Sequence, residues 1–325
     1  MRAIWYDRTG PARQVLELGE RPMPQPGQGQ ALIRVRASGV NPSDAGMRGQ
    51  GPMAYSRITP NSDGAGVVEA VGPGTLSDWV GKRVWFYNGQ RNGRAFGSAA
   101  EYIELDADLL SVLPDEVGFA EGATLGIPCM TAHLSLFLAG PVQGRTVLVT
   151  GGAGAVGHYA VQLAHWAGAT VIATVSSPDK AERALAGGAD HVIDYRREDV
   201  AARVQEITYG EGVHHIVDVD FGGNLETSLA CLRMNGSLAY YATKGQPNPT
   251  LVAGALMRLN LSISGVYLPV SPHEARKRAQ QDITRWIGTG ARILSVAGRY
   301  PLEDCAGAHE QVESGTKVGT VVVEP

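Results

Sequence analysis

The chain has 325 residues, of which 42 are glycine; 44% of all residues are hydrophobic and 18% are charged. This length predicts two domains, and the composition is that of a globular protein, which excludes a collagen and a disordered chain. The formal charge of −4 and the lack of a long basic run argue against a nucleic-acid partner, and no run of about 18 apolar residues predicts a membrane span.

The first 120 residues have the pattern of a β-rich unit. Apolar, β-branched runs bounded by turn residues predict strands at 31–38, 64–71, 83–87 and 99–105. Proline and glycine crowd the segments between these runs, and a short helix is expected to begin at Asn41-Pro42.

From about residue 121, strand-like runs alternate with helical stretches. Strands are predicted at 146–150, 170–175, 191–194, 214–219, 237–241 and 261–266, with helices near 155–167, 178–186, 198–209, 222–233 and 250–258. Apolar strands in alternation with helices indicate a doubly wound parallel sheet, and six strands fit two mononucleotide-binding halves. Left-handed helix caps are expected at Gly168, Gly187, Gly210 and Gly236.

The C-terminal segment is predicted to hold a polar helix (272–287), a strand (292–297), a second helix (303–313) and a final strand (318–323). The pattern leaves open whether this segment continues the second domain or returns to the first.

The most informative motif has the form GxGxxG and follows the predicted strand at 146–150. It reads Gly152-Ala153-Gly154-Ala155-Val156-Gly157 and precedes a predicted helix. The first glycine permits a tight turn, the second lets a pyrophosphate approach the backbone, and the third lets the helix pack on the strand. The helix N-terminus then offers N–H groups to the phosphates. We therefore predict a dinucleotide site; the alternative is a glycine-rich turn without a ligand.

Side chains after the second strand of this unit favour NADP over NAD. An NAD site usually carries an acid about 20 residues after the motif. Here Ser176 and Ser177 stand at the strand end and Lys180 follows, and hydroxyls with a cation suit a 2′-phosphate. Ser177 can equally cap a helix with Pro178 at its first position, and both roles can hold at once. Asp179 speaks for NAD, because a small rearrangement would bring it to the ribose.

Three cysteines and several histidines have ordinary structural interpretations. Cys129, Cys231 and Cys305 are too few and too far apart for a disulfide framework or a metal knuckle. Because Asp7 and Arg8 interrupt the first ten residues, no signal-peptide core is expected there, and the expected location is the cytoplasm. We interpret Cys129 with His133, and the adjacent pair His214 and His215, as structural rather than metal-ligating.

The order of these motifs resembles that of the medium-chain dehydrogenase/reductase superfamily, and within it the zeta-crystallin-like NADPH:quinone oxidoreductases. After the β-rich unit come GIPCMTAH (126–133), VTGGAGAVG (149–157), TVSSPDK (174–180) and DHVIDYR (190–196), so the resemblance covers essentially the whole chain. It implies an α/β fold with a discontinuous GroES-like catalytic domain (1–122 and 263–325) and a Rossmann NADP-binding domain (123–262). It also implies a homodimer or homotetramer.

The resemblance further implies that the chain binds no zinc. Alcohol dehydrogenases of the superfamily hold a catalytic zinc with Cys, His and Cys, and this chain has Asn41, Ser62 and Ile127 at those positions. The segment 88–98 also lacks the cysteines of the structural zinc lobe. Without a Lewis acid, the expected reaction is hydride transfer from NADPH to a quinone, with an enal or enone as the alternative acceptor.

The resemblance places Asn41 and Asp44 beside the nicotinamide. Asn41 would hydrogen-bond the substrate oxygen or the cofactor, and Asp44 would orient the substrate or relay a proton; both could instead cap the helix that starts at Pro42. Position 46, where relatives often carry a tyrosine, is Gly46, and Tyr55 is the nearest phenol that can replace a second family tyrosine.

Three more residues match family positions around the cofactor. Thr131 matches a threonine behind the nicotinamide, Tyr195 a tyrosine that contacts the 2′-phosphate, and Lys317 a basic residue near the phosphates. Each also has a plain structural interpretation: a helix residue, a strand-end aromatic and a solvated lysine. The non-enzymatic alternative is an NADPH-sensing or RNA-binding protein, and the acidic balance speaks against RNA.

Overall fold

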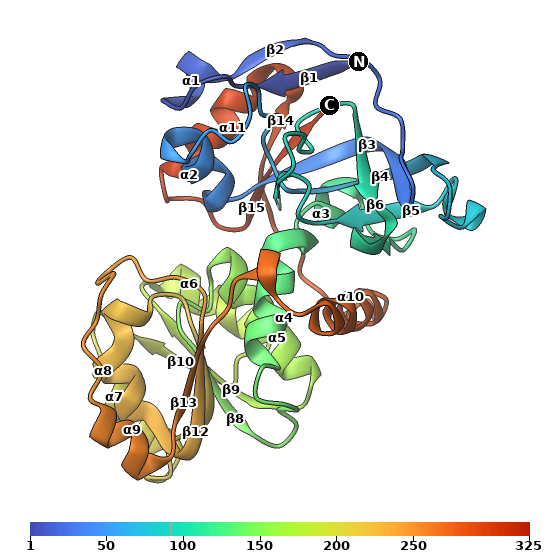
Figure 1. The fold of residues 1–325 in the computed structure, drawn as a ribbon. Coiled ribbons are helices and arrows are strands. Elements are labelled where there is room, and N and C mark those ends of the chain that lie inside the picture. Colours follow the sequence, from blue (N-terminus) through green and yellow to red (C-terminus); the bar gives the residue numbers. More distant parts are fainter. Residues whose placement is uncertain (92) are drawn as a thin grey trace. The chain divides into compact units, whose positions relative to one another are not determined.

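The computed structural model describes residues 1–91 and 93–325, and this part of the chain forms two compact units (Figure 1). The first unit comprises Met1–Ile127, Gln280–Gly288 and Ile293–Pro325, and the second comprises Pro128–Ala279 and Thr289–Arg292. The C-terminal segment therefore belongs largely with the N-terminal one. No helix in the described ranges is long and apolar enough to cross a bilayer.

The first unit is built on a mostly antiparallel sheet whose strands lie in the order β14, β15, β3, β4, β5 and β7, with β6 paired to β3. These strands are β3 (Gln30–Val40), β4 (Asp63–Val71), β5 (Arg83–Phe86), β6 (Tyr102–Asp106), β7 (Leu110–Val112), β14 (Val296–Pro301) and β15 (Thr320–Glu324). Alternate residues of β3, including Ile33 and Val35, are buried with Val84 and Phe86 in one core. Since β15 pairs with β3, the end of the chain completes the sheet that its beginning starts.

The other elements of the first unit are short. A separate antiparallel pair consists of β1 (Arg2–Trp5) and β2 (Glu17–Glu20). The helices are α1 (Ala12–Val15), α2 (Pro42–Gln50), α3 (Phe119–Gly122) and α11 (Cys305–Glu313), and α10 (His273–Ile287) runs from the second unit into the first. Short 3₁₀ turns lie at Ser77–Trp79, Ala107–Leu109 and Leu302–Asp304, and a further one at Leu268–Val270 belongs to the second unit.

Within its described residues, the second unit holds a six-stranded, all-parallel sheet in the order β10, β9, β8, β11, β12, β13. The strands are β8 (Thr146–Val149), β9 (Thr170–Val175), β10 (His191–Asp194), β11 (Val213–Asp218), β12 (Leu232–Tyr240) and β13 (Ser262–Gly265). The helices are α4 (Met130–Leu136), α5 (Ala155–Trp166), α6 (Pro178–Ala186), α7 (Val200–Ile207), α8 (Phe221–Cys231) and α9 (Ala253–Leu259). Figure 1 shows α7, α8 and α9 on one face of the sheet and α4 and α5 on the other, which confirms the doubly wound prediction.

The predicted helix caps are half correct. Gly168 and Gly210 have φ of +77° and +85°, as expected. The left-handed position after α6 is Gly188 rather than Gly187, because the C-cap residue Gly187 still has right-handed backbone angles (φ −76°, ψ −4°). Gly236 lies inside β12, which starts directly after α8 and not at 237 as predicted. The strand expected at 292–297 is β14, four residues later.

A segment that the hydrophobic pattern did not predict as helical ends the first unit and begins the second. Leu125–Cys129 forms a π-helical turn that leads into α4. Inside this turn Gly126 has a non-helical ψ of −117°, and a Cβ there would overlap the side chain of Asp63. Glycine is thus required by close packing at this point.

Candidate functional site

The GxGxxG loop of the second unit is closely packed at both ends and open in the middle. Gly151 has φ of +64°, and its N–H donates to Oγ1 of Thr174 at 3.0 Å. A Cβ at Gly152 would lie 2.7 Å from the Cβ of Ala173, and one at Gly157 would overlap the carbonyl oxygen of Gly151. A Cβ at the exposed Gly154 would meet only this same oxygen, at 3.3 Å. The open middle is where a phosphate can approach the backbone.

Helix α5 begins immediately after this opening. Gly154 is its N-cap and brings no side-chain oxygen to the helix end. The first-turn N–H groups of Ala155, Val156 and Gly157 are therefore offered to an external acceptor, together with the positive end of the helix dipole. The loop and the helix end fit a dinucleotide pyrophosphate.

The predicted 2′-phosphate residues gather at the carboxyl ends of β9 and β10. Oγ of Ser177 accepts from the backbone N–H of Lys180 at 3.4 Å, so Ser177 does cap α6. Nζ of Lys180 donates to Oγ of Ser176 at 2.9 Å. Tyr195 follows β10, its N–H donates to the carbonyl of Val175, and its side chain is half exposed. The helix cap Ser177 and the ammonium group of Lys180 therefore lie together at the carboxyl ends of these strands.

Arg183, which was not among the predicted site residues, also contacts the glycine-rich loop. Its Nε donates to the carbonyl of Ala153 at 3.1 Å, and burial lowers the pKa of its guanidinium. The sequence spacing could have indicated this residue, because Arg183 stands three residues after Lys180 and therefore lies on the same face of α6.

In the first unit, Asn41 and Asp44 form the N-terminus of α2 and are buried. One carboxylate oxygen of Asp44, Oδ2, accepts from the backbone N–H of Asn41 at 2.9 Å and from its Nδ2 at 3.2 Å. The same Nδ2 donates to Oδ2 of Asp63 at 2.7 Å. Both amide hydrogens of Asn41 are therefore engaged, and a substrate oxygen would have to compete with two carboxylates for them.

Two further side chains complete the surroundings of Asp44. Its other oxygen, Oδ1, accepts from Oγ of Ser62 at 2.8 Å and from Nη2 of Arg91 at 2.9 Å. The same Nη2 donates to Oγ of Ser43, also at 2.9 Å. The side chain of Asp44 is fully buried and that of Arg91 is 8% exposed, so this is a buried ion pair. Arg91 lies in the segment 88–98, and no local residue pattern there indicates that it pairs with Asp44.

Asp63 is the second carboxylate of this polar network. Its Oδ2 also accepts from the backbone N–H of Ile127 at 2.8 Å, while Oδ1 has no hydrogen-bond partner among the described residues. Burial, and then the charge of Asp44, raises the pKa of Asp63 well above its ordinary value. The three positions where zinc ligands stand in alcohol dehydrogenases, 41, 62 and 127, therefore converge here on two carboxylates.

The network extends toward the C-terminal part of the chain. Oγ of Ser98 donates to the carbonyl of Asp63 at 2.6 Å and lies 2.7 Å from Oγ of Ser38. Ser38 accepts from Nδ2 of Asn61, whose Oδ1 is 2.9 Å from Nε2 of His309 in α11. Burial lowers the pKa of His309 to about 4, so its ring is neutral. The network therefore joins β3, β4 and α11 inside one unit.

The network does not fit a zinc ion. At Asn41 and Ser62 the groups that point inward are N–H and O–H donors, and at Ile127 it is a backbone N–H, none of which is a zinc ligand. Across residues 1–91 and 93–325, no group of three or more His, Cys, Asp or Glu side chains is placed to hold a metal ion.

Two other predicted residues of the first unit make local contacts. The hydroxyl of Tyr55 donates to the carbonyl of Gly93, in the loop that follows β5, and within the described chain it is not bonded to Asp44. Nζ of Lys317 donates to the carbonyl of Gly319 at 2.8 Å, and burial lowers its pKa.

The remaining positions are simpler. Thr131 lies buried in α4, in the second unit. A Cβ at Gly46 would have open space around it, so the missing tyrosine leaves room at α2.

Comparison with known proteins assigns both units to families. Residues 27–115 match the alcohol dehydrogenase GroES-like domain, and residues 155–284 match the zinc-binding dehydrogenase family. The second match includes none of positions 41, 62 and 127, so its name does not bear on the polar network.

Whole-chain relatives narrow the assignment. The chain is 31% identical over 326 residues to a quinone oxidoreductase of Pongo abelii, with 97% of this chain and 95% of the relative covered. It is 33% identical over 340 residues to a 2-haloacrylate reductase of a Burkholderia species, with coverage of 100% and 99%. A mycobacterial protein solved in complex with NADPH superposes with a TM-score of 0.85, 34% identity and full coverage of both chains. With its GroES-like β unit and Rossmann sheet, the chain belongs to the medium-chain dehydrogenase/reductase family, in its quinone oxidoreductase branch.

Proposed function

We propose that this protein is an NADPH-dependent oxidoreductase that transfers a hydride to a quinone. The relatives named above are a quinone oxidoreductase and a 2-haloacrylate reductase, and the structural neighbour was solved in complex with NADPH. NADPH supplies the hydride when it is bound. The open glycine loop and the free N-terminus of α5 fit its pyrophosphate.

The observation that carries this proposal is the polar network around Asp44 and Asp63. Alcohol dehydrogenases of the superfamily use zinc as a Lewis acid toward alcohols and ketones, but here the family's zinc positions are filled by Asn41, Ser62 and Ile127, which donate hydrogen bonds to these two carboxylates. We infer a zinc-independent enzyme whose acceptor is already electrophilic, such as a quinone. Asp44 and Asn41 would orient the acceptor, and Asp63, whose pKa is raised, would hold a proton within the network.

The proposed preference for NADPH over NADH rests on side chains at the carboxyl ends of β9 and β10. Ser176, Ser177 and Lys180 present hydroxyls and an ammonium group, and Tyr195 adds an exposed ring. Together with Arg183 they would hold the 2′-phosphate. Thr131 and Lys317 stay proposals for the nicotinamide and phosphate ends of the cofactor.

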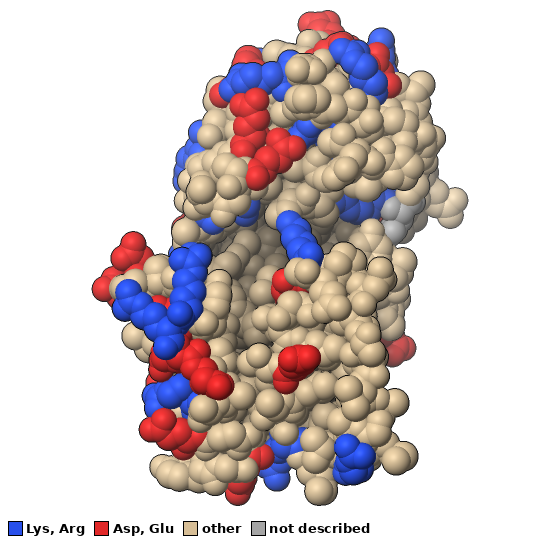
Figure 2. All heavy atoms as spheres, turned by 90° about the vertical axis from the view of Figure 1, so that its left-hand side faces the viewer, with Lys and Arg blue, Asp and Glu red and all other residues tan. Residues whose placement is uncertain are grey.

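We also propose a role for each of the two units and an oligomeric state. The first unit would be the catalytic domain and the second the NADP-binding domain, close to the predicted 1–122 with 263–325 and 123–262. The outer strand β13 has one unpaired edge in the described sheet, where a second copy would pair to give a homodimer or homotetramer. A cytoplasmic location is expected. On the face in Figure 2 basic and acidic side chains are interspersed, which disfavours a nucleic-acid partner.

An NADPH-oxidation screen tests the function. We expect turnover with 1,4-benzoquinone and 9,10-phenanthrenequinone, unchanged after treatment with a chelator, and slower turnover with NADH. A second candidate is reduction of an enal or enone, which the similarity to a 2-haloacrylate reductase favours. Activity with 2-hexenal and none with either quinone would establish this candidate instead, and chelator-sensitive oxidation of simple alcohols would refute both.

A further inference from the structure

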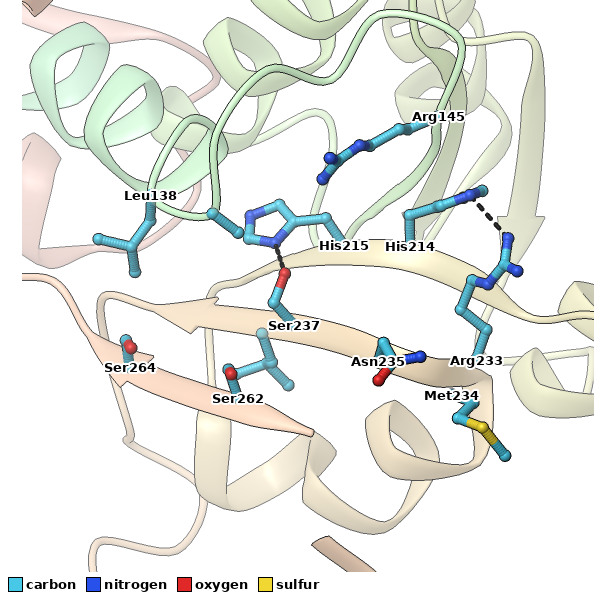
Figure 3. Close-up of a pocket in the computed structure, with 12 residues that line it drawn as sticks. Leu138, Arg145, His214, His215, Arg233, Met234, Asn235, Ser237, Ser262 and Ser264 are labelled. Atoms are coloured by element: carbon cyan, nitrogen blue, oxygen red, sulfur yellow. Dashed lines mark hydrogen bonds between the residues drawn. The ribbon is translucent and has the colours of Figure 1, made fainter. Parts of the chain in front are cut away.

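A polar pocket lies in the second unit, away from the glycine-rich loop. It has a volume of about 610 Å³ and is lined by Leu138, Ala139, Arg145, His214, His215, Arg233, Met234, Asn235, Ser237, Leu238, Ser262 and Ser264 (Figure 3). On β11 and β12 these residues belong mainly to the amino-terminal halves, whereas the GxGxxG loop follows the carboxyl end of β8. The pocket is therefore a separate site on the same sheet.

The charge of this pocket is positive and is not neutralised by its lining. Two guanidinium groups, those of Arg145 and Arg233, reach it, and none of the lining residues is an Asp or a Glu. Among the described residues the side chain of Arg145 makes no hydrogen bond or ion pair, although it is half buried. Arg233 is 3.7 Å from the carboxylate of Glu211, whose side chain is 72% exposed, so this pair is weak.

His214 holds the guanidinium group of Arg233 at the wall of the pocket. Nη1 of Arg233 is hydrogen-bonded to Nε2 of His214 at 2.7 Å, and the backbone N–H of Thr146 lies 3.1 Å from Nδ1 of the same ring (Figure 3). Burial, together with the charges of Arg233 and Arg145, lowers the pKa of His214 and keeps the ring neutral. Because a guanidinium carries five N–H donors, those of Arg233 that are not bonded to His214 are available to an anion.

The opposite side of the pocket offers hydroxyl groups. His215 lies with Nε2 2.9 Å from the carbonyl of Ser135, so Nδ1 accepts from the hydroxyl of Ser237, 2.7 Å away. Both ring nitrogens of His215 are therefore hydrogen-bonded within the protein, and His215 with Ser237 forms a fixed wall of the pocket. Ser262 and Ser264 on β13 have no hydrogen-bond partners among the described side chains and remain as donors.

We propose that this pocket binds a small multivalent oxyanion, a phosphate ester or a polycarboxylate. Two guanidinium groups without a lining carboxylate and two serine hydroxyls offer N–H and O–H donors and positive charge, which is the chemistry that such an anion requires. The volume exceeds that of a single phosphate group, so the ligand carries its charges on a larger body.

Titration calorimetry of the full-length protein with inorganic pyrophosphate tests the site. The glycine loop is first saturated with NADPH, so that remaining binding reports on another site. We expect one pyrophosphate site under these conditions, weakened at least about tenfold by R145Q and by R233Q. The control R203Q removes an exposed arginine of α7 that pairs with glutamates, and it should change the affinity less than about twofold.

Parallel titrations with citrate distinguish the two ligand classes, because a phosphate-ester site would prefer pyrophosphate and a polycarboxylate site citrate. The NADPH affinity of each variant checks that the second unit is folded. No binding of either anion to the NADPH-saturated protein, or equal binding by wild type and R145Q, would overturn the proposal. So would a change of oligomeric state in R145Q and R233Q with unchanged anion binding, since the pocket would then be a contact with a second copy.

Discussion

Replacing Arg91 with glutamine removes the only cation that contacts Asp44 among the described residues. The carboxylate is fully buried, and the two groups are 2.9 Å apart, which corresponds to a gross attraction of about 6 kcal/mol at an effective dielectric constant of 20. Much of this attraction offsets the cost of burying both charges. Removing one partner leaves the other unpaired, and such changes cost about 3–5 kcal/mol. R91Q should therefore destabilise the first unit by about that amount.

The assay is urea unfolding at pH 7, combined in a double-mutant cycle with D44N. The double variant should be more stable than R91Q, because it buries no unpaired charge, and R91K should recover part of the loss. The control R299Q breaks an exposed pair with Glu324 and should cost under about 1 kcal/mol. NADPH affinity should not change, because the cradle lies in the other unit, while kcat with 1,4-benzoquinone should fall about tenfold or more. Stability of R91Q within 1 kcal/mol of wild type, or no coupling with D44N, would refute the reasoning.

Three more predictions concern the second unit. G154A places a Cβ at an exposed position, 3.3 Å from the carbonyl oxygen of Gly151, and should fold with little loss of stability but bind NADPH about tenfold more weakly. In G157A the Cβ overlaps the same carbonyl oxygen and should lower the free energy of unfolding by about 1–3 kcal/mol; equal stability of the two variants would contradict the packing argument. K180Q should raise the Kd for NADPH about tenfold and leave that for NADH unchanged, and an equal loss for both would show that Lys180 does not contact the 2′-phosphate. Burial lowers the pKa of His158 from 6.5 to about 3, so the unfolded chain binds the extra proton and stability is lost as the pH falls below 6.5. Between pH 7 and pH 5 the free energy of unfolding, measured with urea, should therefore fall by about 2 kcal/mol less in H158L than in the wild type. Identical pH dependence of the two proteins would contradict this explanation.

The second unit was the more predictable part of the molecule. Its strands are nearly continuous apolar runs separated by helices, and this local pattern is enough to place β9, β10 and the GxGxxG turn within a residue or two. The strand order then follows from the right-handed connections of parallel strands. The errors fall where local signals conflict, as at Asn235-Gly236, a turn-like pair with a positive φ at Asn235 that lies inside β12.

The network of the first unit could be predicted only in part. Asn41 and Asp44 are close in sequence and form a helix N-terminus, which motif and resemblance both indicated. Asp44 is bonded to Arg91, which lies 47 residues further along the chain, and Asn61 is bonded to His309, which lies 248 residues further along. No local sequence pattern encodes contacts over such separations. Asp63 directly follows Ser62, one of the three family zinc positions, but the raised pKa of Asp63 depends on burial and on Asp44, which only the fold brings close to it.

A structural role for Asn41 is compatible with the proposed role toward the substrate. The side chain does belong to a helix N-terminus, and for that reason its two amide hydrogens are held by Asp44 and Asp63. The pKa of Asp63 is raised, so this group takes up a proton more readily than an ordinary aspartate. When it does, the bond from Asn41 to Asp63 becomes weaker than the bond to Asp44, because a neutral acid is a weaker acceptor than a carboxylate. Protonation of Asp63 would then free the hydrogen of Asn41 that a substrate oxygen needs, while Arg91 keeps Asp44 in place. In this proposal, capping fixes the position of the amide, and the protonation state of Asp63 would determine when the amide can donate to a substrate.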